Sequence, residues 1–475
     1  MKDTAFQVVV IGAGLAGLSA AIRSAESGVA VCVIEREAEE SYLCASRMSG
    51  GLFHVAMEDM GAPAATVRAN IERMMEGTSD PALADALAAN SSRTLDWLRK
   101  QGIRFIGAGP EGFRKNSLSP PGIRQTGCRR EDGAPYWVGR CGDTMLRTLG
   151  SALERHGGRI IRGVEATGLL MHEGRCTGVT AHSEGRELRL EAEAVVIADG
   201  GFQSDPTLLK KLITAQPDGL LQRNARTGRG AGLRMAVEAG ARLVGLDRFY
   251  GHLVHRDALQ DDALWPYPVI DSLATAGIIV DVTGRRFCDE GWGGVHITNE
   301  VAKLADPLGT WVIFDQAIWD GPAKDWLLPP NPYLPAAGGR ILQASTLDEL
   351  ASKAGINATG LSATVEAYNR FVLQQQEIDP PRRSQSTKPW PIAKGPFLAV
   401  PAAAGITYAM GGIATDASGR VLREPGEPIP GLYAVGACTG GLEGGGHSGY
   451  SGGLSKASVF GMLAGEHIAS TVARG

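Results

Sequence analysis

Residues 8–21 read VVVIGAGLAGLSAA: four apolar, strand-forming residues lead into a glycine turn and then into small helix-forming residues. Gly12, Gly14 and Gly17 have the GxGxxG spacing of a dinucleotide-binding turn. In such a turn, the first glycine allows the tight bend and the second lets the backbone approach a pyrophosphate. The third permits close packing of the helix. The stretch therefore predicts a nucleotide-binding βαβ unit over residues 6–36.

The end of the second predicted strand carries the next part of the motif. Glu35 closes the apolar stretch 29–35 and stands 18 residues after Gly17, where dinucleotide folds place the acid that accepts the ribose hydroxyls. The start of the intervening helix offers N–H groups and positive potential to the phosphates. Ala16 beside the turn and Arg36 beside the acid complete the cofactor residues predicted in this unit.

Length and composition indicate a globular protein of two domains. The 475 residues exceed the roughly 250 to 300 residues at which a single core stops growing. A hydrophobic fraction of 44% is ordinary. Glycine, with 64 of the 475 residues, is well above its usual fraction of about 7%. The net charge is −4 without a long run of one sign, so we expect neither nucleic acid nor an anionic membrane surface as a partner.

The cysteines and the first residues predict a cytoplasmic location. Seven scattered cysteines without a CxxC pair argue against a disulfide framework and against a zinc site, so no metal is expected. The start MKDTAFQVVV has no secretory signal, and the sequence has no run of 18 or more apolar residues. We therefore expect no membrane insertion.

The remaining patterns alternate between helix and strand. Helices are predicted over residues 64–75, 82–100, 143–156 and 454–469, and strands over 160–165, 176–182, 187–191, 194–198 and 431–435. The strands within 160–191 are interpreted as a small β-meander, and 194–198 as the return to a parallel sheet.

Between residues 248 and 394 this rhythm is lost and Trp and Pro become more frequent. The predicted fold class is therefore α/β. A discontinuous Rossmann-type domain, residues 1–247 and 395–475, carries an inserted α+β cap domain, residues 248–394.

Further motifs follow the βαβ unit in a fixed order. They are SRMSGG (46–51), IADGGF (197–202), TGRGAGL (227–233), GRRFCDEG (284–291), YAMGGIATD (408–416), GLYAVG (431–436) and a glycine cluster at 440–453. Over nearly the whole chain this set resembles the FAD-binding fumarate reductase and succinate dehydrogenase flavoprotein superfamily. GRRFCDEG and the last glycine cluster are most similar to the tricarballylate dehydrogenase-like branch, whose members bind FAD non-covalently.

The resemblance implies where FAD would lie. It places Ser49, Gly50 and Gly51 along the flavin, Val164 beside the adenine, Asp199 and Gly200 near the ribose and pyrophosphate, and Gly436, Gly453 and Leu454 near the isoalloxazine. Asp199 and Ala437 depart from the family, which usually has Thr and Glu there. Cys44 stands where covalent members have the flavin-bearing histidine, and we expect it to pack as a small hydrophobe.

The substrate end departs from the fumarate reductases, whose arginines and histidines clamp two carboxylates. His252 matches the first histidine, but Tyr408 replaces the second. Ser448 stands at the position of one arginine and Trp319 at that of the proton-donating arginine. A buried dicarboxylate without these groups would lose several kcal/mol of charge-assisted bonding, which argues against fumarate reduction.

The polar residues expected around the substrate suit a ketone, an amide or at most a monocarboxylate. These predicted catalytic residues are Tyr408, His252, His296, His447, Ser448 and Tyr450. Tyr408 and His296 are the candidate acid or base that handles the second hydrogen. Gly294 occupies the position of the ketosteroid dehydrogenase tyrosine. Glu290 could relay protons or form an ion pair with Arg285 or Arg286.

The sequence as a whole predicts an FAD-dependent dehydrogenase that desaturates a carbon–carbon bond next to a carbonyl or carboxyl group. An external acceptor would reoxidise the flavin, and no second GxGxxG in the strand–turn–helix context of a nicotinamide site is evident. One alternative is an ene-reductase that uses the same site in reverse. Another, of a different class, is a flavin-binding module without its own turnover.

Overall fold

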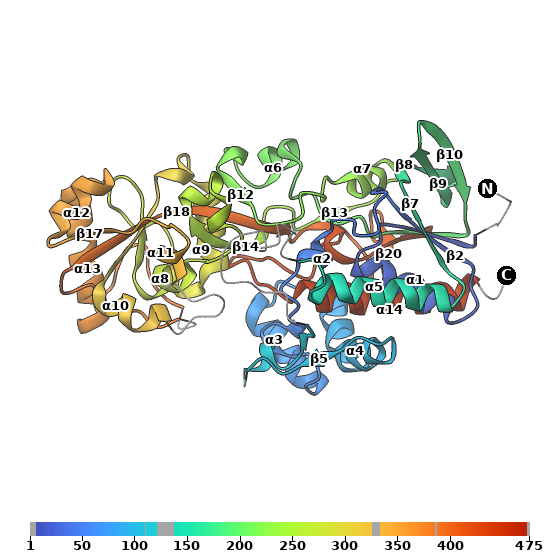
Figure 1. Cartoon of the computed structure of the whole chain (residues 1–475), viewed down its shortest axis with the longest axis horizontal. Helices are drawn as coiled ribbons and strands as arrows, with labels where there is room; N and C mark the ends of the chain where they lie inside the picture. Colours follow the sequence, from blue (N-terminus) through green and yellow to red (C-terminus); the bar gives the residue numbers. More distant parts are fainter. Residues whose placement is uncertain (1–5, 110, 121–136, 325–332, 385–386, 473–475) are drawn as a thin grey trace.

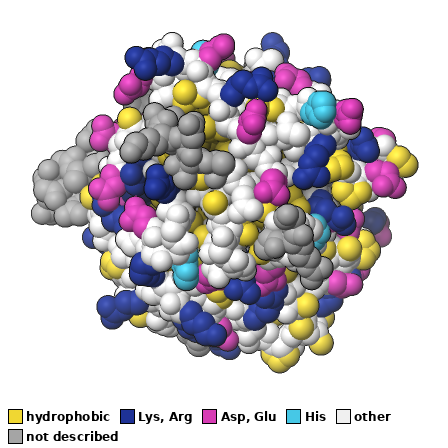
Figure 2. Space-filling view, turned by 90° about the vertical axis from the view of Figure 1, so that its right-hand side faces the viewer, with side chains coloured by type: hydrophobic (Ala, Val, Ile, Leu, Met, Phe, Trp, Pro, Cys, Tyr) yellow, Lys and Arg dark blue, Asp and Glu magenta, His cyan; other side chains and the backbone are white. Residues whose placement is uncertain are grey.

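The structure, a computed structural model, describes residues 6–109, 111–120, 137–324, 333–384 and 387–472. Figure 1 shows two lobes, with the long strand β18 (Phe397–Ala409) reaching from one lobe to the other. The nucleotide-binding lobe holds both ends of the described chain. At the far end of this lobe, Lys and Arg side chains are interspersed with Asp and Glu (Figure 2), in keeping with the mixed charge of the sequence.

A six-stranded sheet, mostly parallel, organises the nucleotide-binding lobe. Its order is β20 (Arg420–Leu422), β21 (Pro428–Ala434), β11 (Ala194–Ile197), β1 (Val8–Ile11), β2 (Val31–Glu35) and β7 (Arg159–Arg162). Only β20 pairs antiparallel to its neighbour. The central strand β1 is apolar at every position because both of its faces are covered. Val8 and Val10 pack into one hydrophobic core, and Val9 and Ile11 into another.

Helices cover one face of this sheet. They are α1 (Leu15–Ala25), α5 (Cys141–Arg155) and α14 (Gly453–Val472), which lie side by side in Figure 1. A Cβ atom on Gly461 would lie 2.5 Å from the carbonyl oxygen of Ala16, so glycine is needed where α14 crosses α1. The N-terminal and C-terminal parts of the sequence thus share one core, and the discontinuous α/β domain is confirmed.

A three-stranded antiparallel sheet covers the other face and corrects one prediction. Its strands are β8 (Glu165–His172), β9 (Arg175–Ser183) and β10 (Arg186–Glu191). A strand is present near the predicted position 160–165, but its assignment to the meander is wrong, because β7 pairs with β2 in the parallel sheet instead. Gly163 turns the chain with a φ of +70° and separates β7 from β8. β8, the first strand of the three-stranded sheet, was not predicted from the sequence.

The second lobe is built on another six-stranded sheet. The path β12 (Leu220–Gln222), β18, β16 (Trp311–Asp315) and β15 (Ile278–Val280) is joined by β14 (Phe249–His255) and β17 (Leu342–Ala344), which both pair with β18. The helices of this lobe are α8 (Asp271–Ala276), α9 (Gly294–Lys303), α10 (Gln316–Asp320), α11 (Tyr333–Ala336), α12 (Leu347–Ala354) and α13 (Ala358–Gln374). The limits 248 and 394 of the cap stay a prediction, although β12 and β18 lie outside them and belong to this sheet.

Further helices and short strand pairs connect the two lobes and extend the first. The helices are α2 (Ala45–Met48), α3 (Ala64–Met75), α4 (Pro81–Lys100), α6 (Pro206–Leu212) and α7 (Ala231–Glu238). The strand pairs are β3 (His54–Val55) with β4 (Glu58–Asp59), β5 (Phe105–Ile106) with β6 (Ser117–Leu118), and β13 (Leu243–Val244) with β19 (Gly412–Ile413). Within the described part of the chain, no helix combines the length and apolar character needed to cross a bilayer.

A buried ion pair stabilises the second lobe. Glu290 accepts a hydrogen bond of 2.8 Å from Nε of Arg286 and a second from its Nη2, and both side chains are fully buried. Arg382 lies 3.9 Å from the same carboxylate. Of the two readings that the sequence left open for Glu290, the structure therefore favours the ion pair.

Glu290→Gln is expected to lower the free energy of unfolding by about 3–5 kcal/mol, because it leaves buried arginine charge uncompensated. Urea unfolding of the purified protein measures this loss. Glu366→Gln makes the same chemical change in an exposed pair with Arg370 and should leave stability nearly unchanged. Equal stabilities of the two variants would contradict a structural role for Glu290.

Candidate active site

A cavity of about 1160 Å³ is lined by residues of both lobes. The nucleotide-binding lobe contributes the glycine turn after β1 and the segment around α2. The second lobe contributes β14, β18 and the loop before α8. All predicted cofactor residues except Gly17 line this cavity.

The glycine turn has the geometry that its sequence predicts. Gly12 has a φ of +100°, and a Cβ atom there would lie 2.6 Å from the carbonyl oxygen of Ala198. Gly14 faces the cavity, whereas a Cβ on Gly17 would lie 2.1 Å from the Gly12 oxygen, so Gly17 serves helix packing. The first turn of α1 has no acidic residue, although its Leu15 N–H donates to Oγ of Ser46. Its positive end is therefore available to an anionic ligand.

Glu35 lies at the end of β2 and is held by backbone groups. Its Oε2 accepts a hydrogen bond from the Ala13 N–H, and its Oε1 accepts one from the Glu37 N–H, each at 3.1 Å. Burial raises the pKa of Glu35 above its ordinary value. The carboxyl group is thus fixed at the edge of the cavity, beside Arg36.

Three buried oxygen atoms on the cavity wall have no hydrogen-bond partner within the described residues. They are Oδ1 of Asp199, Oε1 of Gln203 and Oγ of Ser448. An unsatisfied buried polar atom costs about 1–3 kcal/mol, so a polar ligand that bonded to these atoms would stabilise the site. The residues present therefore fit a long polar cofactor such as FAD. Gln203 was missed by the sequence analysis, although it follows the IADGGF motif directly.

Asp199 gives a pH-dependent prediction for the protein without cofactor. Burial raises the pKa of Asp199 from 3.8 to about 6. Because the folded state then holds the proton more tightly than the unfolded chain, stability is lost as the pH rises through about 6. Asp199→Asn still offers an acceptor to the Gly232 N–H, which now donates to Oδ2 at 2.7 Å.

The Asp199→Asn apoprotein should therefore be more stable than the wild-type apoprotein by roughly 1–3 kcal/mol at pH 8, and about equally stable at pH 4. Urea unfolding at the two pH values measures both differences. A stability gain of the same size at pH 4 and pH 8 would show that ionisation of Asp199 is not its cause.

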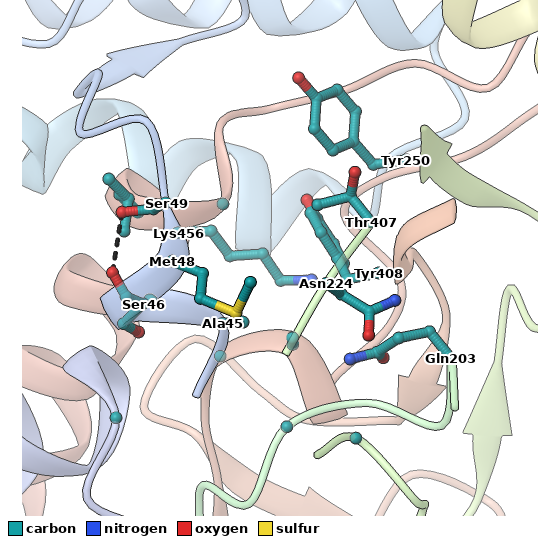
Figure 3. A pocket seen from close by; sticks show the side chains of 18 of the residues that line it. Ala45, Ser46, Met48, Ser49, Gln203, Asn224, Tyr250, Thr407, Tyr408 and Lys456 are labelled. Carbon is teal, nitrogen blue, oxygen red and sulfur yellow. Dashed lines mark hydrogen bonds between the residues drawn. The ribbon is translucent and has the colours of Figure 1, made fainter. Parts of the chain in front are cut away.

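The segment around α2 forms the middle of the cavity wall. Ser46 Oγ accepts a hydrogen bond from the Leu15 N–H at 3.1 Å. Ser49 Oγ donates to the Ser46 carbonyl oxygen at 2.8 Å, the dashed line in Figure 3. Cys44 is half-buried: it packs against the hydrophobic core that contains Val8 and Val10, and it also lines the cavity. Burial raises its pKa to about 11, so the thiol stays protonated and unreactive at neutral pH.

Three tyrosines and a histidine gather at the other end of the cavity. Tyr250 and His252 come from β14, Tyr408 from β18, and Tyr450 from the loop before α14. The rings of Tyr250 and Tyr450 are stacked, with centroids 3.8 Å apart and an interplanar angle of 14°. Together these rings form an aromatic wall.

Tyr250, His252 and Asp271 form a hydrogen-bonded chain. The His252 Nδ1 is 2.5 Å from Oδ2 of Asp271, and its Nε2 is 2.9 Å from the Tyr250 hydroxyl. The Leu253 N–H donates to Asp271 Oδ1 at 2.8 Å and fixes the carboxylate. Burial raises the pKa of Tyr250 well above its ordinary value, so its hydroxyl is protonated at neutral pH. Sequence reasoning missed Tyr250 and Asp271. Tyr250 could have been found from His252, because residues two apart on a strand share a face.

Tyr408 belongs to a second buried network. Its hydroxyl donates to Oε1 of Glu443 at 2.8 Å, and Lys456 Nζ is 3.1 Å from Oε2 of the same carboxylate. The backbone N–H and the hydroxyl of Ser451 also donate to Oε1, at 3.0 and 2.7 Å. In Figure 3 the Lys456 side chain extends from the side of Ser49 toward Tyr408. Burial, together with the Glu443 charge, raises the pKa of Tyr408 well above its ordinary value.

The three other predicted catalytic residues, His447, Ser448 and His296, differ in whether they line the cavity. His447 and Ser448 line the cavity, and the ring of His447 stacks on Trp292 with centroids 3.7 Å apart. The Nδ1 of His447 also contacts the carboxylate of Glu76. His296, on α9, is buried beside His447 and does not line the cavity. Burial lowers its pKa to about 4, which keeps the ring neutral.

Comparison with known proteins identifies the family. Residues 7–454 match the family model described as "FAD binding domain". Because the match covers most of the chain, the protein belongs to this family of flavoproteins, and FAD is its cofactor. The predicted superfamily is also confirmed, since relatives and structural neighbours include fumarate reductases and steroid dehydrogenases.

The curated relatives are oxidoreductases. NADH:fumarate oxidoreductase of Klebsiella pneumoniae (strain 342) is 26% identical over 482 residues, which cover 99% of this chain and 48% of that protein. 4-Oxocyclohex-2-ene-1-carboxylate 5-dehydrogenase of Sinomonas cyclohexanicum is 26% identical over 568 residues, covering 98% of this chain and 94% of that protein. The chain spans 48% of the Klebsiella protein and only 37% of NADH:acrylate oxidoreductase of Vibrio harveyi.

Solved structures share the fold. The 3-ketosteroid delta1-dehydrogenase of Sterolibacterium denitrificans has a TM-score of 0.74 and 19% identity, with 98% of this chain and 100% of that chain covered. A flavocytochrome c3 fumarate reductase has a TM-score of 0.69 and 22% identity, with coverages of 99% and 79%. These likenesses confirm the fold class, a nucleotide-binding domain with a cap.

Proposed function

We propose that this protein is an FAD-dependent oxidoreductase that acts on a carbon–carbon bond next to a carbonyl or carboxyl group. The observation that carries the proposal is a single cavity with a dinucleotide site at one end and the Tyr250–His252–Asp271 chain at the other. The relatives support the reaction class, since their names describe fumarate and acrylate oxidoreductases and dehydrogenases of ring ketones.

The predicted cofactor residues would divide FAD between them. Glu35 would accept the ribose hydroxyls, and Gly12, Gly14, Ala16 and the start of α1 would hold the pyrophosphate. Arg36 would lie beside Glu35 at the adenosine. The remaining contacts are assigned as the resemblance implies: Val164, Asp199 and Gly200 toward the adenosine and pyrophosphate, and Ser49, Gly50, Gly51, Gly436, Gly453 and Leu454 toward the isoalloxazine.

The bound isoalloxazine supplies a hydride acceptor or donor at N5, and the protein must handle the accompanying proton. In desaturation, the Tyr250 oxygen takes the substrate proton while its own proton passes to Nε2 of His252. The Asp271 carboxylate stabilises the resulting imidazolium through Nδ1. Reduction of the double bond would run the same transfers in reverse.

This assignment differs from the sequence-based candidates for the acid or base. The Tyr408 hydroxyl already donates a hydrogen bond to Glu443, and His296 does not line the cavity. We assign Tyr408 to positioning, through its contact with Tyr250, whose ring centroid is 5.7 Å away. His447, Ser448 and Tyr450 would form the rest of the substrate wall.

We further propose dehydrogenation as the working direction, with an external electron acceptor and a cytoplasmic location. The test is anaerobic titration of the oxidised protein with saturated ketones and monocarboxylic acids, followed by absorbance. Bleaching of the flavin supports the dehydrogenase. If dithionite-reduced protein is instead reoxidised by enones or enoates alone, the ene-reductase is supported. No response in either titration would contradict both and leave a flavin-binding module.

A further inference from the structure

Arg223 is a buried arginine on the cavity wall without an acidic partner. It follows β12, lines the cavity, and is only 9% exposed. No carboxylate of the described residues lies within ion-pair distance of it. A buried charge is costly unless it is paired, so the structure leaves a place for an anion at this side chain.

The side chain of Arg223 is held in place by neutral groups. Its Nε donates to the Pro266 carbonyl oxygen at 3.0 Å, and its Nη1 donates to Oγ1 of Thr407 at 3.1 Å. The guanidinium carbon lies 5.1 Å from the centroid of the Tyr267 ring. A guanidinium has five N–H donors, and these two bonds leave others for a ligand. The group is therefore preorganised.

Arg223 lies next to the Tyr250–His252 strand. A Cβ on Gly405 would lie 2.6 Å from its Cδ, so glycine there makes room for the arginine. Gly405 pairs with His252 across β14 and β18. The positive charge of Arg223 also opposes the rise of the Tyr250 pKa, which places the guanidinium near that hydroxyl.

The other described cations on the cavity wall have different surroundings. Lys456 is paired with Glu443, and Arg36 is paired with Glu37 beside the ribose site. Arg73, Arg229 and Arg383 are exposed. Arg223 is thus the one described cation of the cavity wall that is both buried and without a carboxylate partner.

We propose that Arg223 binds the carboxylate of the substrate, which makes the substrate a small monocarboxylate. The proposal rests on the proposed function, because it deepens the assignment of the same site. Arginine is suited to this role by its planar, two-pronged donor geometry. With a single such arginine, the site accommodates one carboxylate, and the aromatic wall, together with Tyr267, receives the apolar body beside it.

The test measures binding rather than turnover. Crotonate and cyclohexanecarboxylate are compared with crotonamide and cyclohexanecarboxamide, which have nearly the same shape without the charge. Dissociation constants come from the change in flavin absorption of the FAD-loaded protein at pH 7. Each acid is expected to bind about 10- to 100-fold more tightly than its amide, the range for a hydrogen bond to a charged group.

Arg223→Gln should remove this preference, and Arg223→Lys should retain part of it. Arg229→Gln changes an exposed arginine on the same wall and should retain it fully. Equal binding of acids and amides by the wild-type protein would overturn the proposal, and so would a preference that survives in Arg223→Gln. The wild-type comparison decides the question even if Arg223→Gln does not fold.

The same titrations separate this proposal from the proposed function. An Arg223-dependent preference in a protein whose flavin never bleaches or reoxidises would support the anion site and contradict the oxidoreductase. Flavin bleaching by neutral ketones, without any preference for acids, would support the oxidoreductase and overturn the anion site.

Discussion

Tyr250→Phe is expected to slow turnover by about 10²- to 10⁴-fold while FAD remains bound. The phenol oxygen is the group that we assign to the substrate proton, and phenylalanine keeps the stacked ring and removes only that oxygen. The measurement is the anaerobic rate of flavin bleaching at saturating substrate, with the flavin content of each preparation determined after heat release.

Two further variants make this result specific. Asp271→Asn preserves the shape of the side chain but removes the charge that stabilises a protonated His252, so it should slow bleaching in the same direction. Tyr368→Phe removes the hydroxyl of another buried tyrosine, which donates to the Ala276 carbonyl oxygen and does not line the cavity. Its bleaching rate should stay close to wild type. Unchanged bleaching in Tyr250→Phe would exclude Tyr250 as the acid or base.

Gly14→Val is expected to weaken FAD binding by roughly 10- to 100-fold without unfolding the protein. Gly14 has a φ of −74°, which any residue adopts, and its nearest neighbour would be Ser46 Oγ at 3.5 Å from an added Cβ. The added side chain therefore fits the fold but occupies space on the cavity wall where the pyrophosphate would approach. Fluorescence titration of apoprotein with FAD gives the dissociation constants.

Gly107→Val is the matched control, since nothing lies within 4 Å of a Cβ at that position and it does not line the cavity. Its affinity for FAD should equal that of the wild type. If Gly14→Val binds FAD as tightly as Gly107→Val does, the pyrophosphate does not pass the glycine turn.

Local patterns predicted the nucleotide-binding half of the fold. The GxGxxG turn, Glu35 and the helices α1, α3, α4, α5 and α14 all lie where the sequence placed them, within a few residues. These elements are determined by short-range signals such as glycine spacing and apolar periodicity. The error at 160–165 arose because Gly163, with a positive φ, ends β7 and leads into β8, and the predicted strand ran across this turn.

The substrate end was predicted less completely, because its contacts join segments far apart in the sequence. His252 and Tyr408 were named from family motifs, but their partners Asp271 and Glu443 are 19 and 35 residues away. Arg223 belongs to none of the motifs found in the sequence. That it has no acidic partner is known only from the folded structure, in which β12 lies beside β18. His296 was placed in the pocket from its sequence position, whereas α9 buries it beside His447.

The most direct test of the central claim is the absorption spectrum of the purified protein under anaerobic conditions, before and after a saturated ketone or monocarboxylic acid is added. A flavin spectrum that bleaches on addition, with FAD released intact by heat or acid, is the result that we predict. A colourless protein that cannot be reconstituted with FAD would contradict the account from the cofactor site onward.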